Sequence, residues 1–150
     1  VNSSLSSFCY TAVCLSAAVN KPAAAKTFMA DKAGGLVNDL FLARGSRVLL
    51  TRNLWSEAGL VNGAHCFIRY IIYREGVDHT RDPPPMPDLL LVEVPGYTGP
   101  SYLDGMDRIV PILPMTHVWS TQGHENMSRM QFPLLPGYGI TIHKAQGKEF

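Results

Sequence analysis

Cysteines, charges and long apolar segments are all scarce in this sequence of 150 residues. It has three cysteines, an odd number too small for the disulfide framework of a secreted domain, which favours an intracellular protein. No apolar run reaches the ~18 residues that a transmembrane helix needs. The longest, residues 8–19, is interrupted by Thr11 and Ser16, so we expect no membrane partner. Hydrophobic residues still make up 46% of the chain, which is typical of a globular domain with its own core.

Charged residues are few, at 17%, and the formal net charge is only +1. Their distribution is uneven: residues 1–75 carry eight Lys or Arg against four Asp or Glu, net +4, whereas residues 76–150 carry five against eight, net −3. A protein that binds a polyanion would turn the first half toward it. Ordinary solvated surfaces show the same pattern, so charge alone leaves both interpretations open.

Short runs of β-branched and aromatic residues dominate the middle of the sequence. Gly and Pro turns separate them, and the clearest hairpin signals are Arg44-Gly45-Ser46 and Asn62-Gly63. The prolines within residues 108–114 predict an edge strand, because proline cannot donate a hydrogen bond to a sheet. We therefore expect a small antiparallel β-barrel over residues 44–118, with a polar loop over residues 116–128.

The segments on either side indicate a different kind of domain. Residues 139–142, GITI, are apolar without alternation, as in a buried parallel strand, and a polar loop closed by Gly147 follows. Ligands of open α/β sheets bind at the carboxyl ends of such strands. The expected fold class is α/β, β-rich overall, with the barrel as an insertion. Because the sequence starts at Val1 and stops at Phe150, just after this loop, we expect a fragment.

Three polar side chains emerge together at the end of the predicted strand. On an extended segment Thr141 and His143 point to the face opposite Ile140 and Ile142, and Lys144 follows directly. A hydroxyl, an imidazole and an ammonium group can all donate hydrogen bonds to phosphate oxygens. From the residues alone, a phosphate-contacting loop and an ordinary polar strand end both remain open.

The segment ITIHKAQGKEF, residues 140–150, resembles motif V of superfamily 1 DNA helicases of the RecD/Pif type. GSRVLLTRNLWSEAGLVNGA, residues 45–64, is similar to the segment that opens the inserted domain 2B of that family. Three further segments match in the same order: LVEVPGYTGPSY, RIVPILPMTHVW and RMQFPL. The resemblance covers most of the chain and is weakest over residues 1–35.

The resemblance implies a fold and a division into domains. Residues 1–43 and 119–150 would be part of the second RecA-like domain of a P-loop NTPase, domain 2A, and residues 44–118 the inserted SH3-like barrel, domain 2B. Enzymes of this family use ATP hydrolysis to move 5′ to 3′ along single-stranded DNA, and serve DNA repair, recombination and telomere maintenance. The chain would be the part of such a helicase that contacts single-stranded DNA and couples it to ATP hydrolysis.

By the same resemblance, the loop after the strand carries the functional side chains. Gln146 and Gly147 would lie toward the ATP cleft and couple the nucleotide state to the grip on DNA, and Glu149 would reach the nucleotide ribose. The DNA contacts would come from the following residues of motif V and the barrel: Thr141, His143 and Lys144, with Arg47, Arg52 and Asn53 flanking the exit path of the strand.

Motifs for ATP chemistry are missing from these 150 residues. They contain no G-x-x-x-x-G-K-[ST] phosphate loop, no Asp-Glu pair of a Walker B motif and no motif VI with its arginine finger. ATP and Mg²⁺ would therefore be bound by an intact parent with a first RecA-like domain. We assign no catalytic residue and no metal ligand to this fragment, which should be inactive alone. The parent is expected inside the cell: in a eukaryote the nucleus comes first, with the mitochondrion as the alternative.

Two other functions remain open. A stand-alone β-barrel that binds a protein or peptide fits the middle of the chain, but it gives no reason for the ending HKAQG. A decayed, transposon-borne helicase remnant without activity is the second, because Ala145 and Cys66 stand where the family commonly has Ser and Gly.

Two groups of side chains receive ordinary interpretations. The residues that could suggest a metal site or a Cys–His nucleophile match no usual spacing: His65, Cys66, His117 and His124. Trp55 and Trp119 are assigned to packing rather than to base stacking, since large aromatic side chains mostly serve cores.

Overall fold

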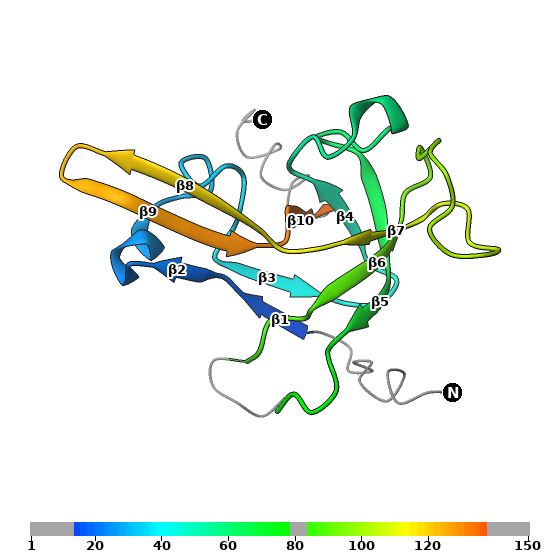
Figure 1. Ribbon diagram of the computed structural model, residues 1–150, viewed down its shortest axis with the longest axis horizontal. Coiled ribbons are helices and arrows are strands. Elements are labelled where there is room, and N and C mark those ends of the chain that lie inside the picture. The colour runs from blue at the N-terminus through cyan, green and yellow to red at the C-terminus, as the bar shows by residue number, and fades with distance from the viewer. Residues whose placement is uncertain (1–13, 79–83, 138–150) are drawn as a thin grey trace, which may run out of the picture.

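The computed structural model describes residues 14–78 and 84–137, which form three antiparallel sheets (Figure 1). The largest has five strands in the order β10-β4-β5-β6-β7, a second has the order β2-β9-β8, and β1 pairs with β3. No helix in this part of the chain is long and apolar enough to cross a membrane. The bounds are β1 Cys14–Ala17, β2 Val19–Lys21, β3 Asp39–Leu42, β4 Arg47–Leu50, β5 His65–Ile72, β6 Leu89–Glu93, β7 Ile109–Ile112, β8 Met115–Thr121, β9 His124–Gln131 and β10 Leu134–Pro136, with 3-10 helices η2 Ala23–Thr27 and η3 Ser56–Ala58.

The hydrophobic core lies between one face of the five-stranded sheet and β3. On β5, Cys66 and Ile68 are fully buried while His65 is exposed, as expected for a strand with one buried face. A β-bulge between Ile68 and Tyr70 shifts the register, so Ile71 continues the buried face. The remaining core side chains include Leu40, Leu42, Val48, Leu50, Leu90, Val92, Val110 and Ile112.

Two turn predictions and one strand prediction are confirmed. The amide of Ser46 donates to the carbonyl of Ala43 at 3.0 Å, and Gly45 between them has φ +83°. Gly63, in the predicted Asn-Gly turn, has φ +93°, a conformation that glycine adopts without strain. β7 is an edge strand, as its prolines indicated, and Pro111 lies opposite Leu91.

The expected closed barrel is not found. β10 and β7 are the two edges of the five-stranded sheet, and no ladder joins them among the described residues. Closure fails because the chain leaves β7 at Pro114 and pairs its next strand, β8, with β9 in a different sheet. The SH3-like description and the RecA-like character of the flanking segments stay predictions.

The expected polar loop over residues 116–128 is wrong: this segment belongs to the β8–β9 hairpin. The turn is made at Gly123, with φ +81°, and Trp119 faces Met127 across the ladder. The error came from judging polarity without regard to its period: along β8 the half-buried Met115, His117 and Trp119 alternate with the exposed Thr116, Val118 and Ser120. β8 also runs across the predicted boundary at residue 118, and the division into domains stays a prediction.

β9 holds the N-terminal segment through two buried polar side chains. Gln131 is fully buried; its Nε2 donates to the carbonyl of Ser16 at 2.8 Å, and its Oε1 accepts from the Ser16 hydroxyl at 2.7 Å. Arg129, two residues earlier, is also buried and faces the same side. The segment that contains β1 and β2 is therefore attached to β9 by hydrogen bonds as well as by apolar packing.

Candidate nucleic-acid interface

Most of the predicted site lies outside the described residues 14–78 and 84–137. The residues of the motif V segment in this position are Thr141, His143, Lys144, Gln146, Gly147 and Glu149. Their roles stay predictions. The three DNA-contact candidates of the barrel segment are described, and the structure places each in a different environment.

Arg47 is the first residue of β4, and its side chain is exposed. Its guanidinium carbon lies 6.0 Å from the ring centroid of Phe67 on β5. The aliphatic part of the side chain runs along Gly137, where a Cβ atom would come within 2.9 Å of Cγ and Cδ of Arg47. Arg47 is therefore beside the chain that continues, in sequence, toward the motif V segment.

Asn53 has a structural role. Its Oδ1 accepts a hydrogen bond of 2.7 Å from the backbone amide of Asn62. This bond closes the loop between β4 and β5 across the predicted Asn-Gly turn. The side-chain oxygen of Asn53 is consequently engaged, and DNA contact by this residue receives no support from the geometry.

Arg52 meets His117 at a tight glycine turn. A Cβ atom on Gly34 would lie 2.7 Å from Nδ1 of His117 and 2.9 Å from Nη1 of Arg52, so both groups lie against one backbone position. Nη1 of Arg52 donates to the Gly34 carbonyl at 3.3 Å, a long bond that leaves most of the guanidinium donors free. Three residues pack against this turn, Thr51, Arg52 and His117, and Trp119 stacks on His117; we call these four the Arg52–His117 cluster.

The cluster holds a positive charge without an anionic partner. The ion pairs among the described residues are Arg69–Glu93 and Arg74–Asp88, and Arg52 takes part in neither. Two further donors in the cluster, Oγ1 of Thr51 and Nε1 of Trp119, are buried and lack a hydrogen-bond partner. The arrangement is suited to an anion such as a phosphate group.

Trp119 supports the cluster from within. Its ring lies 6.1 Å from that of His117 at an interplanar angle of 19° and 5.6 Å from that of Phe28 at 74°. The packing predicted for Trp119 is thus observed, against Phe28 rather than in the core of the five-stranded sheet. Trp55, by contrast, is 40% exposed, and its predicted packing is limited to one edge contact with Tyr97. Sequence reasoning missed His117 as a partner of Arg52. The alternation Thr-His-Val-Trp-Ser, which puts His117 and Trp119 on one face of a strand, was the signal that could have found it.

A Cys–His nucleophile at Cys66 is contradicted by the burial of its thiol. Cys66 is fully buried, and burial raises the pKa of its thiol from 9.0 to about 12, so it is not a nucleophile at neutral pH. The neighbouring His65 is exposed, because successive strand residues face opposite sides. Within the described ranges, no three His, Cys, Asp or Glu residues come together in a way that could hold a metal ion.

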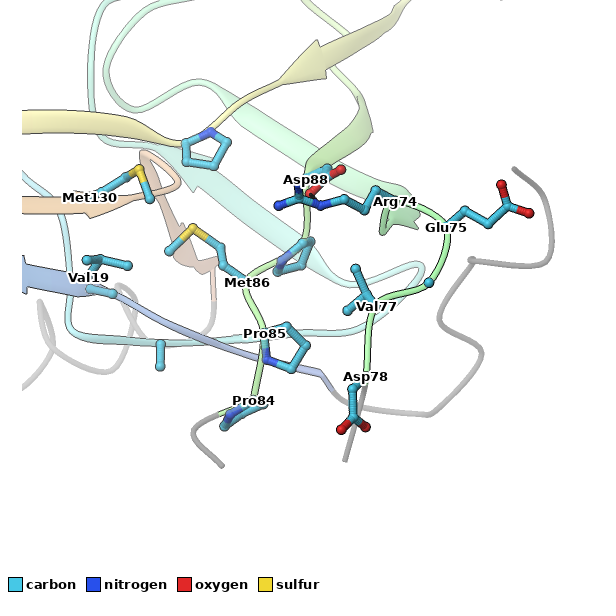
Figure 2. Close-up of a pocket in the computed structure, with 15 residues that line it drawn as sticks. Val19, Arg74, Glu75, Val77, Asp78, Pro84, Pro85, Met86, Asp88 and Met130 are labelled. Atoms are coloured by element: carbon cyan, nitrogen blue, oxygen red, sulfur yellow. Dashed lines mark ion pairs between the residues drawn. The ribbon is translucent and has the colours of Figure 1, made fainter. Parts of the chain in front are cut away.

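A groove of about 700 Å³ opens between the β5–β6 connection and the β1–β2 segment (Figure 2). Its lining is largely apolar and includes Val19, Val77 and Met86. At its rim Arg74 pairs with Asp88 at 3.6 Å. The remaining charges that line it, on Glu75 and Asp78, are negative, so this groove does not suit a phosphate.

No protein-family model matches this chain, and no curated protein matches it by sequence. Solved structures do. A structure of two coordinating Pif1 helicases that unwind forked double-stranded DNA is 23% identical, with a TM-score of 0.53, and the match covers 90% of this chain and 24% of that one. Pif1 from Bacteroides bound to single-stranded DNA is 19% identical, with a TM-score of 0.52 and coverage of 93% and 28%. A double mutant of the Bacteroides Pif1 helicase is 19% identical, with a TM-score of 0.55, and the match covers 98% of this chain and 29% of that one.

The fold is similar to part of a Pif1 helicase. The expected resemblance to helicases of the RecD/Pif type is thereby confirmed at the level of the fold. The chain spans less than a third of the length of each of these Pif1 structures, with coverage of 24%, 28% and 29%. What the rest of such a helicase contributes is therefore not contained in these residues.

Proposed function

We propose that this chain is the DNA-contacting part of the second motor domain of an ATP-dependent 5′ to 3′ DNA helicase. The observation that carries the proposal is the Pif1-like fold, which Bacteroides Pif1 shows while bound to single-stranded DNA. The sequence supports it independently, because the motif V resemblance falls on residues 140–150. In this proposal residues 1–43 and 119–150 belong to the RecA-like domain 2A and residues 44–118 to the SH3-like domain 2B.

Motif V would supply the main grip on DNA. Thr141, His143 and Lys144 donate to backbone phosphates, which carry no sequence information and so suit a motor that moves over any sequence. Gln146, Gly147 and Glu149 would lie toward the nucleotide and couple its state to that grip.

Arg52, with His117 beside it, is the best-supported DNA contact among the described residues, because the cluster offers an unpaired guanidinium with further donors. Arg47 is a weaker candidate, and Asn53 is engaged elsewhere. A phosphate held at the cluster would add a second grip point, away from motif V in sequence, along the same strand of DNA.

ATP and Mg²⁺ do not fit the residues of this chain alone. The 150 residues lack a phosphate loop, and no cluster of metal-ligating side chains occurs in the described ranges. Nucleotide binding would belong to a parent protein in which the first RecA-like domain completes the cleft. An intracellular parent, nuclear or mitochondrial in a eukaryote, stays a proposal.

Binding of fluorescent single-stranded oligonucleotides by the 150-residue chain, followed by anisotropy over a salt series, tests the proposal. Lys144→Ala should weaken binding about equally on several sequences and reduce the slope of log affinity against log salt by about 0.7, the value for one lost contact on a single strand. Lys26→Ala removes the same charge from the exposed side of η2 and should change neither quantity.

Absence of binding to single-stranded DNA at low salt would contradict the proposed function. Equal effects of Lys144→Ala and Lys26→Ala would contradict the assignment of motif V. Arg52→Ala and His117→Gln test the cluster separately, and each should weaken binding without preference for sequence. Arg74→Ala, at an exposed and paired arginine, is the matched control.

A further inference from the structure

At one end of the five-stranded sheet the loop with η3 meets the loop between β6 and β7 (Figure 1, upper right). These two loops carry an exposed apolar surface. Five large apolar side chains are between 37% and 51% exposed on these two loops: Leu54, Trp55, Tyr102, Leu103 and Met106. We call them the Trp55–Tyr102 surface. Single exposed apolar residues are common, but a contiguous group of them usually marks a binding surface.

The surface is preformed rather than loose. Tyr97 is buried beneath it; its hydroxyl donates to the carbonyl of Pro100 at 2.6 Å, and its ring lies 6.4 Å from that of Trp55 and 6.2 Å from that of Tyr102. The two loops are joined by the amide of Thr98, which donates to the carbonyl of Ala58 at 2.9 Å. Both exposed rings therefore rest on one buried ring, and binding would cost little ordering entropy.

The charges around the surface are mainly negative. Three exposed acids lie on the same two loops, Glu57, Asp104 and Asp107, against one exposed base, Arg108. The other base of these loops, Arg52, is half-buried and donates to the Gly34 carbonyl. The hydroxyl of Ser101 donates to Asp107 at 2.8 Å, which holds that carboxylate in place. This sign repels a DNA backbone and attracts a polycation.

We propose that the Trp55–Tyr102 surface docks a basic polypeptide segment in which Lys or Arg alternates with large apolar residues. Apolar side chains would cover Leu54, Leu103 and Met106, and cationic groups would lie over the rings of Trp55 and Tyr102 and beside the carboxylates. Trp and Tyr are the residue types that most often dominate such interfaces. The proposal concerns a protein partner and does not depend on the DNA contacts proposed above.

The test uses the full 150-residue chain and labelled synthetic peptides. The probe alternates Lys or Arg with Leu or Phe; the two comparison peptides replace either its basic residues by Glu or its apolar residues by Ser. We expect the probe to bind at least tenfold more tightly than either comparison peptide. Trp55→Ala and Tyr102→Ala should each weaken it about tenfold, and Asp104→Lys several-fold. Phe41→Ala, at an exposed aromatic side chain on β3, should leave it unchanged.

Amide chemical shifts of the unmodified chain provide a readout that does not depend on how the variants fold. Binding of the probe should change the amide chemical shifts of residues 54–60 and 97–107 and leave those of β8 and β9 unchanged. The proposal is overturned by probe binding that survives both aromatic substitutions, by shifts elsewhere, or by preferential binding of single-stranded DNA to this surface. Concentration-dependent dimerisation that Trp55→Ala abolishes would overturn it too, because the occupant would then be a second copy of the chain.

Discussion

Nε of Arg129 on β9 donates a hydrogen bond of 2.8 Å to Oδ1 of Asn20 on β2. The other guanidinium donors reach carbonyl oxygens of the same N-terminal segment, those of Ala25, Phe28 and Leu36, at 2.6 to 3.0 Å. Arg129 is 1% exposed, and burial lowers the pKa of its guanidinium. The described part of the chain gives it no carboxylate. Its charge is thus balanced by neutral dipoles, and four hydrogen bonds from its guanidinium tie residues 20–36 to β9.

Replacing Arg129 by Met should therefore destabilise the chain by about 3–5 kcal/mol. Methionine fills much of the volume but leaves several buried carbonyl groups without a donor, each at a cost of about 1–3 kcal/mol. The stability of Arg129→Lys should lie between those of the wild-type chain and Arg129→Met, because the three donors of an ammonium group cannot reproduce the geometry of the planar guanidinium. Urea unfolding at equilibrium measures both. The control is Arg74→Ala, at an exposed ion pair, which should change stability by less than about 0.5 kcal/mol. An Arg129→Met variant as stable as this control would show that the hydrogen bonds of Arg129 do not hold residues 20–36 to β9.

The two turns and the edge strand could be predicted from the sequence because they depend on local chemistry. The turns at Gly45 and Gly63 were predicted from the residue types at these positions, and the edge position of β7 was predicted from its proline, Pro111. In each case neighbouring residues carry enough information to fix the backbone.

What could not be predicted depends on contacts between distant segments. The residues next to Arg129 in the sequence do not show that residues 20–36 supply its hydrogen-bond acceptors. The burial of Arg129 could therefore not be predicted. The meeting of Arg52 with His117 depends on the glycine turn at Gly34, which is distant from both residues in the sequence. The open sheet likewise arises from the pairing of β8 with β9. This pairing was not predicted, because the polar residues 116–128 were interpreted as a loop.

Gly59→Ala should be far more costly than Gly45→Ala, although both glycines have positive φ, +92° and +83°. A Cβ atom on Gly59 would collide with the carbonyl oxygen of Gly96, whereas a Cβ atom on Gly45 meets nothing within 4 Å. The left-handed conformation alone costs about 1–2 kcal/mol, and the collision should bring Gly59→Ala to about 3 kcal/mol or more. Equal midpoints in urea for the two variants would show that the loops separate freely.

The 150 residues alone should not hydrolyse ATP, with or without single-stranded DNA. The phosphate loop and the arginine finger are absent from the sequence, so nothing in it stabilises the transferred phosphoryl group. Phosphate release is the measurement, and the Lys144→Ala variant identifies contaminants, whose turnover it would not affect. Turnover that DNA stimulates and Lys144→Ala abolishes would prove this prediction wrong.

Cys66 should make the stability of the chain fall with rising pH above about 9. Burial raises its thiol pKa from 9.0 to about 12, so the folded chain keeps a proton that the unfolded chain loses between these values. Below pH 9 both states are protonated and Cys66 contributes no pH dependence. From pH 9 to 12 its contribution falls by up to about 1.4 kcal/mol per pH unit. Because Tyr and Lys side chains titrate there too, the measurement is the difference in urea stability between the wild-type chain and Cys66→Ala at pH 8 and pH 10. That difference should shrink by about 1 kcal/mol or slightly more, and a constant difference would mean that the thiol ionises in the folded chain as readily as in the unfolded one.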